Sequence, residues 1–221
     1  MIRTSEDIKK DIIDQLYWDN RVDASDVNVD VREGYVTLMG SMPSFLAQQS
    51  VQDDAWIVEG VVQIENQIDV EFGETVPGHE DLRTHLANMF RWNPNLTDQP
   101  IEISVDNGIV TLTGTTDAVW KKLRAENICL GVLGVQGVTN EITVVPTHSV
   151  LDETIADSIM AALTRNVGVD ERAVNVKVER GIVTLSGTVS SWVARNAAFD
   201  TALFTDGVVD VVDNLVIDTG A

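Results

Sequence analysis

The amino-acid sequence has little cysteine and no long apolar run. Its 221 residues include one cysteine, Cys129, so no disulfide can form within the chain. No apolar run approaches the roughly 20 residues that span a bilayer. The opening residues are charged and lack the apolar core of a secretory signal. We therefore expect a cytoplasmic location for the chain as written, or a periplasmic one if an upstream signal has been removed.

Basic side chains are also scarce. The chain has 15 Lys and Arg residues against 35 Asp and Glu residues, which gives a formal net charge of -20. Such a charge repels the phosphate backbone, so nucleic acid is not an expected partner. The same charge opposes anionic lipid surfaces, so any contact with a membrane requires a local basic or apolar patch.

Sequence patterns typical of catalytic and metal sites are missing as well. The sequence contains no Gly-x-Ser-x-Gly elbow and no phosphate-binding Gly-rich loop, and no histidine stands near Cys129. The three histidines, His79, His85 and His148, do not have zinc-ligand spacing. We expect no enzymatic activity, no metal and no cofactor.

One motif, Gly-x-Val-Thr-Leu-x-Gly, occurs three times. It spans Gly34 to Gly40, Gly108 to Gly114 and Gly181 to Gly187, at intervals of 74 and 73 residues. A repeat of this period indicates copies of one folding unit. We divide the chain into repeats of residues 1–73, 74–147 and 148–221.

Each motif predicts a β-hairpin. Apolar residues alternate with polar ones before the first glycine and continue as Val-Thr-Leu after it. The turn residues include Asn107-Gly108, a pair that favours a type I′ turn because both central residues need positive φ. We interpret the glycines of the motifs as structural turn residues: Gly34, Gly40, Gly108, Gly114, Gly181 and Gly187.

Helical patterns flank each hairpin. Apolar residues three and four apart precede it, as in Ile8, Ile12, Leu16 and in Leu82, Leu86, Met89. These first helices are expected to begin near residues 5, 80 and 152, with Ser5 and Asp152 suited to the helix N-terminus. Second helices are expected over 44–56, 117–130 and 190–203, each followed by a third strand.

The predicted fold class is α+β. Three tandem α-β-β-α-β modules are expected, each a three-stranded mixed sheet with two helices packed on one face. The third strand should run parallel to the second because a helix connects them, whereas the order of the strands is left open.

These features resemble the BON domain, named for bacterial OsmY and nodulation proteins. The resemblance rests on the three glycine motifs and on the late Val-x-Asn-x-hydrophobic strand, best seen at Gly137 to Ile142. It implies a non-catalytic binding module, found in envelope and osmotic-stress proteins, that binds phospholipid or tethers proteins at membranes.

One cluster is a candidate binding site. Trp120, Lys121, Lys122 and Arg124 lie on the predicted second helix of the second repeat. The three repeats carry net charges of -10, -4 and -6, so the second is the least acidic. Tryptophan beside cations is typical of a helix that lies at a lipid interface. The alternative is an ordinary solvated helix face.

The other tryptophans are expected to pack. Trp18 and Trp92 occupy equivalent positions, 16 residues before the first glycine of their motifs, which suggests a contact between modules or a cap on the core. Trp56 aligns with Leu130 and Leu203 and is expected in the core, as is Cys129, which aligns with alanines.

Two functions remain open. The first is a binding module for phospholipid or for a membrane-associated protein. The second is a soluble cytoplasmic protein whose tethered modules bind several protein partners without lipid.

Overall fold

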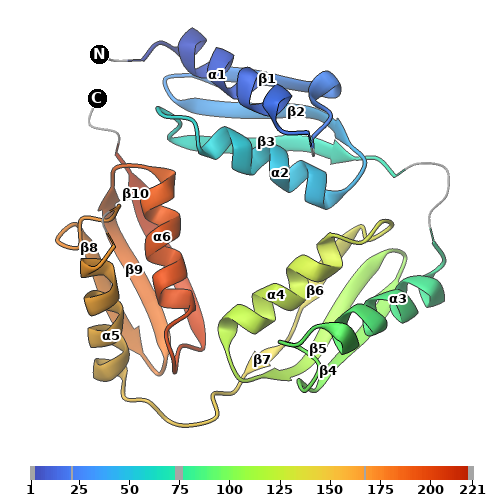
Figure 1. Ribbon diagram of the computed structural model, residues 1–221, viewed down its shortest axis with the longest axis vertical. Helices are drawn as coiled ribbons and strands as arrows, with labels where there is room; N and C mark the ends of the chain where they lie inside the picture. Colours follow the sequence, from blue (N-terminus) through green and yellow to red (C-terminus); the bar gives the residue numbers. More distant parts are fainter. Residues whose placement is uncertain (1–2, 21, 73–76, 167, 219–221) are drawn as a thin grey trace.

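The computed structural model describes residues 3–20, 22–72, 77–166 and 168–218. Within them each repeat forms one module with the order helix, strand, strand, helix, strand (Figure 1). This confirms the predicted fold class. The first module contains α1 (Ser5–Trp18), the short 3-10 helix η1 (Ala24–Asp26), β1 (Val27–Arg32), β2 (Tyr35–Met42), α2 (Phe45–Trp56) and β3 (Gln63–Val70).

The other two modules repeat this order. The second contains α3 (His79–Trp92), β4 (Ile101–Asp106), β5 (Ile109–Thr116), α4 (Val119–Leu130), β6 (Gly137–Asn140) and β7 (Thr143–Val144). The third contains α5 (Asp152–Thr164), β8 (Val174–Glu179), β9 (Ile182–Val189), α6 (Trp192–Leu203) and β10 (Asp210–Ile217). In the second module the last strand is divided, and both β6 and β7 pair with β5.

The second strand of each module is the centre of its sheet. β2 pairs antiparallel with β1 and parallel with β3, and the orders β4-β5-β6 and β8-β9-β10 repeat this arrangement. The third strand is therefore parallel to the second, as the connecting helix predicts. Both helices of a module lie on one face of its sheet (Figure 1).

The core of each module lies between the helices and the sheet. In the first module Ile8, Ile12 and Leu16 of α1 are buried against Val36 and Leu38 of β2. In α3 the buried residue of the last turn is Phe90, whereas the predicted Met89 is exposed. The buried residue follows Leu86 by four positions, whereas the prediction had taken the apolar residue three positions after it.

The first glycine of each motif lies in a tight turn, as predicted. Glu33 and Gly34 have φ values of 51° and 82°, which fit a type I′ hairpin. The second glycine was wrongly assigned to a turn, since Gly40, Gly114 and Gly187 lie inside β2, β5 and β9. A β-carbon at Gly114 would lie 2.0 Å from the carbonyl oxygen of Pro100, so the close approach of the neighbouring chain requires glycine.

Ser5 and Asp152 do not cap their helices. α1 is capped by Thr4, which forms a capping box with Asp7. The Asp152 carboxylate instead accepts hydrogen bonds from the amides of Arg180 and Gly181, at 2.7 Å and 2.8 Å. The Ser5 hydroxyl likewise accepts from the Glu33 amide. These side chains tie the start of the first helix to the hairpin turn, a long-range role that the local sequence does not reveal.

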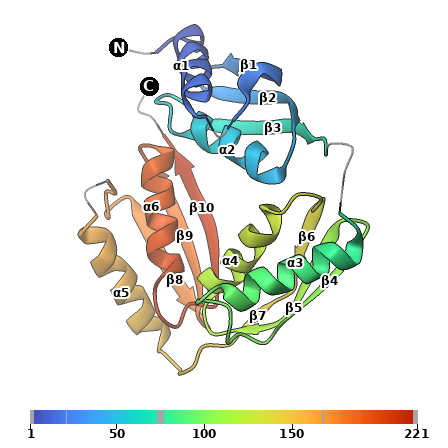
Figure 2. The same ribbon diagram turned by 45° about the vertical axis from the view of Figure 1, so that its right-hand side comes forward.

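The three modules are arranged around a common middle. In Figures 1 and 2 the second helices α2, α4 and α6 face this middle, and β10 ends beside the first module. The indole rings of Trp56 and Trp192 stack across modules one and three, with centroids 6.1 Å apart and planes at 9°. Between the first two modules, the sequence predicts a linker over 73–79, of which residues 73–76 lie outside the described residues. Between the second and third modules it predicts a linker over 146–150, where His148 Nε2 lies 2.8 Å from Asp206 Oδ2.

Candidate functional site

The basic cluster predicted from the sequence begins in the first turn of α4. Lys121 Nζ lies 2.7 Å from Asp117 Oδ1 and 5.7 Å from the centroid of the Trp120 ring. The Lys121 side chain is only 17% exposed. The structure therefore brings Trp120 and Lys121 together, but the charge of Lys121 is largely offset by Asp117.

Lys122 and Arg124 are the cations of this cluster that remain accessible, on two different sides of α4. Arg124 is exposed and Lys122 is partly exposed. Within the described residues neither makes an ion pair, in contrast to Lys121. The Asn140 amide donates to the Lys122 carbonyl oxygen and to Glu126 Oε2, both at 3.0 Å. This link to the end of β6 fixes the position of the helix segment that carries the two cations.

Trp120 points toward the third module. Its ring lies 6.2 Å from the Phe204 ring, centroid to centroid, at a tilt of 46°. The adjacent Val119 is 4% exposed and belongs to the hydrophobic cluster of the third module, against which Leu123 also packs. The tryptophan of the candidate site is thus part of a contact between modules, a placement that the sequence could not show.

Two other tryptophans lie on the surface. Trp18 and Trp92 are 80% and 81% exposed at the ends of α1 and α3, so the prediction that they pack was wrong. Trp56, expected in a module core, is partly buried and packs against the clusters of modules one and three. The equivalence of Trp18 and Trp92 was visible in the sequence, but their outward direction depends on where each helix ends.

Two hollows of similar position lie in the modules that carry these tryptophans, and Trp18 lines the first hollow, whereas Trp92 does not line the second. Both lie between the first helix of a module and the residues after its second helix. The first, of about 460 Å³, includes Trp18, Ile57 and Glu59 in its lining. The second, of about 380 Å³, is lined largely by apolar side chains that include Met89 and Leu133. Equivalent hollows are therefore present in modules one and two.

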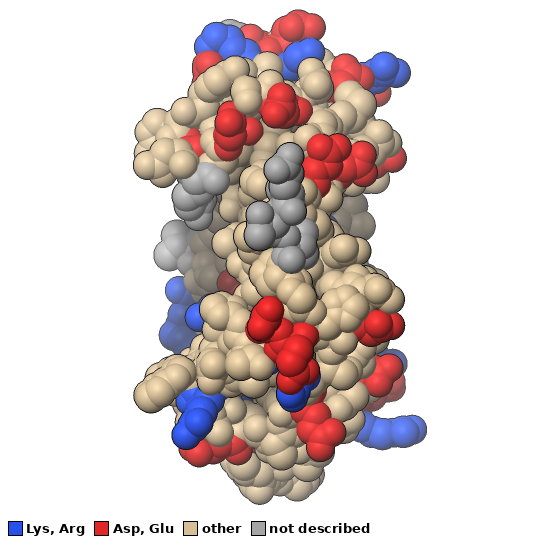
Figure 3. Space-filling model, turned by 90° about the vertical axis from the view of Figure 1, so that its right-hand side faces the viewer, with Lys and Arg blue, Asp and Glu red and all other residues tan. Residues whose placement is uncertain are grey.

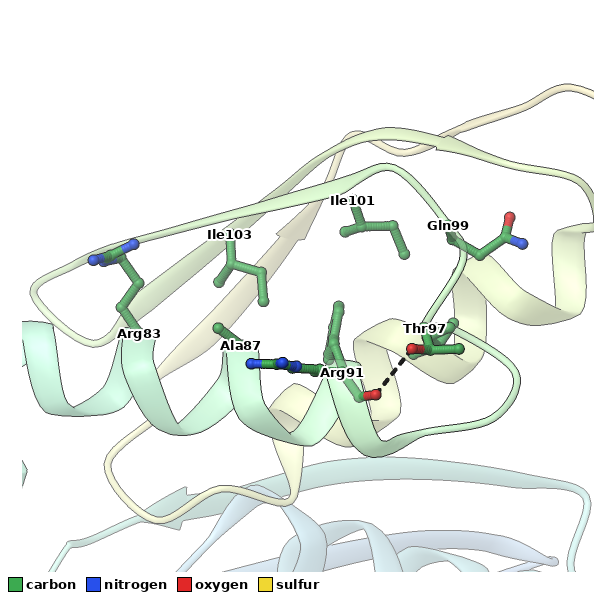
Figure 4. A pocket seen from close by; sticks show the side chains of 9 residues that line it. Arg83, Ala87, Arg91, Thr97, Gln99, Ile101 and Ile103 are labelled. Carbon is green, nitrogen blue, oxygen red and sulfur yellow. Dashed lines mark hydrogen bonds between the residues drawn. The ribbon is translucent and has the colours of Figure 1, made fainter.

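A separate pocket lies at the outer edge of the second module (Figure 4). Arg83, Arg91 and Thr97 surround it, with Ile101 and Ile103 of β4 on the opposite side. Its volume of about 250 Å³ is below the roughly 300–1,000 Å³ of typical ligand sites. Arg83 is also engaged with Glu80 at 2.6 Å. We do not assign a ligand to this pocket.

Surface charge agrees with the acidic composition. On the face shown in Figure 3, acidic side chains are spread over the surface and the basic ones are separated from one another. This face offers no broad basic area for a polyanion.

Cys129 is buried, as predicted. Burial raises the pKa of its thiol to about 12, and the nearby Glu126 adds to the shift. The thiolate that nucleophilic or redox chemistry requires is therefore disfavoured. Among the described residues no group of His, Cys, Asp and Glu is arranged to hold a metal ion.

Sequence comparison matches the BON domain to residues 4–71, 79–146 and 151–219, which is most of the chain. The chain belongs to the BON domain family. One BON domain corresponds to each of the three structural modules. Among the described helices, none has both the length and the apolar character needed to cross a bilayer.

Two curated relatives are similar to part of this BON protein. "Uncharacterized protein in gshII 5'region" from Anaplasma centrale is 30% identical over 117 residues, 51% of this chain and 78% of that protein. Osmotically-inducible protein Y from Escherichia coli (strain K12) is 31% identical over 127 residues, 55% of this chain and 63% of that protein. The chain thus spans just under two thirds of the latter.

Among solved structures, CdsD, a structural protein of the Type III secretion system of Chlamydia trachomatis, covers 96% of this chain at 12% identity. The aligned region is 92% of that chain, with a TM-score of 0.28. A likeness this weak supports no argument about this protein.

The asparagine of the late strand has a structural role in these BON modules. Asn140 Oδ1 accepts a hydrogen bond from the Ile142 amide while its Nδ2 holds α4. In the third module Asp213 takes this position, since it pairs with Leu185 as Asn140 pairs with Leu112. From the sequence, Asn214 is the expected equivalent of Asn140, because both are asparagines of the late strand, but the strand register shows that this expectation is wrong by one residue. The motif joins the third strand to the second helix in each case.

Proposed function

We propose that this protein is a non-catalytic BON-type binding protein that contacts anionic phospholipid through α4 of its second module. The observation that carries the proposal is that Lys122 and Arg124 of α4 are both accessible to solvent and make no ion pair in the described part of the chain. In a protein of net charge -20, such a pair in the least acidic module is a local attraction for phosphate.

The relatives support a physiological setting for this proposal. One of them carries the name osmotically-inducible protein Y, and we extend a role in osmotic or envelope stress to this chain. The buried, protonated Cys129 and the lack of a metal-binding group among the described residues support a binding role rather than catalysis. The proposal holds for either the cytoplasmic or the periplasmic side of a membrane.

The expected affinity is modest. Each Lys or Arg near an anionic surface contributes about 1 kcal/mol. Replacing Lys122 with Glu removes one attraction and adds one repulsion, so a loss of about 2 kcal/mol, or roughly thirtyfold in affinity, is expected. Arg124→Glu should have a similar effect because Arg124 is the more exposed of the two.

Co-sedimentation with phospholipid vesicles tests the proposal. Intact protein should bind phosphatidylglycerol vesicles at low salt, bind less in high salt, and ignore phosphatidylcholine vesicles. Arg91→Glu is the matched control, since it makes the same charge change on an exposed residue of α3 in the same module. Equal losses for Lys122→Glu and Arg91→Glu would show that only net charge matters. No binding in any condition would reject the lipid proposal.

A second function is favoured by a different observation. Trp18 and Trp92 are exposed at equivalent positions, with similar hollows in their modules. Exposed tryptophans are frequent anchors of protein interfaces. This arrangement supports a multivalent protein-interaction module in which the first two modules present the same surface, and closely linked weak sites reinforce one another.

Cross-linking in cells separates the two functions. If the second function holds, Trp18→Ala together with Trp92→Ala should abolish the protein cross-links of the wild type, while Lys122→Glu should leave them unchanged. Protein cross-links that survive the double tryptophan variant would contradict the second function.

A further inference from the structure

The contacts between modules repeat one arrangement. The start of the second helix in one module meets the end of the second helix in the next, and the third module closes onto the first. Between modules one and two, Leu46 Cδ2 lies 4.0 Å from the position that a β-carbon of Gly131 would take. Between modules two and three, Trp120 lies against Phe204. Between modules three and one, Trp192 lies against Trp56. These head-to-tail contacts between equivalent positions close a ring of three, as in a cyclic trimer.

The third module makes the aromatic contacts of this ring. Trp192 and Phe204 lie at the beginning and just past the end of α6, and each packs on a tryptophan of another module. The hydrophobic cluster of the third module also includes Val119 from α4. The third module therefore rests on both of the others and covers the first turn of α4.

The helix whose first turn the third module covers, α4, is the proposed lipid-binding helix. Trp120 stands next to Lys121 and Lys122, and an amphipathic helix at a lipid interface uses an aromatic ring at the headgroup level with cations beside it. While Phe204 lies on Trp120, that ring cannot enter a membrane, and only the cations can approach the phosphates.

From these contacts we infer that the third module is an autoinhibitory cover whose release exposes Trp120 to an anionic phospholipid surface. The inference rests on the proposed function and names the regulation of the same site. Docking of the third module and insertion of Trp120 into a membrane exclude each other. Docking therefore lowers the affinity for the membrane by the same factor by which membrane binding lowers the docking equilibrium constant.

The contacts suit a reversible cover. The aromatic contacts are made by side chains at helix ends, and Phe204 remains 64% exposed although it touches Trp120. Contacts of this kind are small compared with a module core, so undocking can occur while each module stays folded. If the docked form dominates, the apparent affinity for vesicles is reduced by the fraction of undocked protein.

The test uses a variant in which Trp192→Ala is combined with Phe204→Ala, which removes both aromatic contacts of the third module. We call it the released variant, and it keeps all residues of α4. Val193→Ala is the matched control, because it shortens an exposed apolar residue of α6 that lies next to Trp192. Circular dichroism checks that the modules remain folded, and Phe204→Ala alone serves if the double variant is unfolded.

Small-angle X-ray scattering and binding to phosphatidylglycerol vesicles are the two measurements. We expect the released variant to have a larger radius of gyration and to bind the vesicles about tenfold more tightly than the wild type. Adding Trp120→Ala should remove this gain. The Val193→Ala control should match the wild type in both measurements.

The possible failures are distinguishable. In the first case, the wild type binds anionic vesicles in a salt-dependent way, and the released variant has a larger radius of gyration but no higher affinity. The inference of an autoinhibitory cover is then rejected, and the proposed function stands. If the released variant does not expand, the aromatic contacts do not hold the third module, and the inference is also rejected. If neither protein binds anionic vesicles, both the proposed function and the inference of an autoinhibitory cover are rejected.

Discussion

Gly114→Ala tests how strictly the fold depends on the second glycine of the repeated motif. The new β-carbon would lie 2.0 Å from the Pro100 carbonyl oxygen and 3.1 Å from its carbon. Non-bonded carbon atoms prefer about 3.5–4.0 Å, so the backbone would have to move. It cannot move freely, because the Thr115 amide donates to the same Pro100 oxygen at 3.2 Å.

The cost of this change has two parts. Gly114 has a φ of 107°, where a side chain adds backbone strain of about 1–3 kcal/mol. Forcing an extra carbon into a packed site adds about 1–3 kcal/mol. We expect a loss of about 4 kcal/mol, which is comparable to the whole stability of a small module at roughly 0.05–0.15 kcal/mol per residue.

Urea unfolding followed by two-dimensional NMR provides the assay, because amide signals report each module separately. Gly131→Ala is the control in the same module, since Gly131 has negative φ and its nearest atoms would lie at an ordinary 3.6 Å. The signals of residues 101–144 should disappear at a much lower urea concentration in Gly114→Ala than in Gly131→Ala. Equal unfolding midpoints for the two variants would refute the steric argument.

Three further predictions concern single side chains. Asp152→Ala should destabilise the third module by about 1–3 kcal/mol in urea unfolding, because two turn amides lose their acceptor; an unchanged midpoint would show that water replaces the carboxylate without cost. Cys129 should react with a thiol reagent at pH 8 only as fast as the second module unfolds, because the thiol is buried and its pKa is about 12; rapid labelling of folded protein would contradict this. Burial raises the pKa of Asp200, so its charged form opposes folding at neutral pH, and this penalty disappears as the pH falls below the pKa of the unfolded chain. Asp200→Asn, which copies Asn127 of the second module, should therefore raise the thermal midpoint at pH 7 but not at pH 3, and a rise that is equal at both values would contradict the assignment.

The sequence predicted what depends on local patterns. The hairpin turns, the helices and the parallel third strand follow from period and turn chemistry within each repeat, and comparison of the copies made these signals specific. The same comparison misplaced the third copy of the late-strand asparagine by one residue, at Asn214 where Asp213 stands, and the choice of a three-residue step after Leu86 misplaced Met89. The comparison also could not show that Asp152 binds a turn 28 residues away.

The candidate site was predicted only in part. Local sequence was enough to find the cations of α4, because they are close together in the sequence of one predicted helix. The direction of Trp120 toward Phe204 depends on how the modules dock, which no pattern within a repeat reports. The exposure of Trp18 and Trp92 was missed for a related reason, since aromatic residues usually pack and these two end their helices on the outer surface.

The central claim, that α4 of the second module meets the membrane, can be tested most directly by NMR with vesicles that contain a spin-labelled anionic lipid. If α4 meets the membrane, amide signals of residues 119–124 should broaden more than those elsewhere, and high salt should remove the effect. Broadening confined to the ends of α1 and α3, around Trp18 and Trp92, would contradict this claim and assign the membrane contact to the outer surface instead.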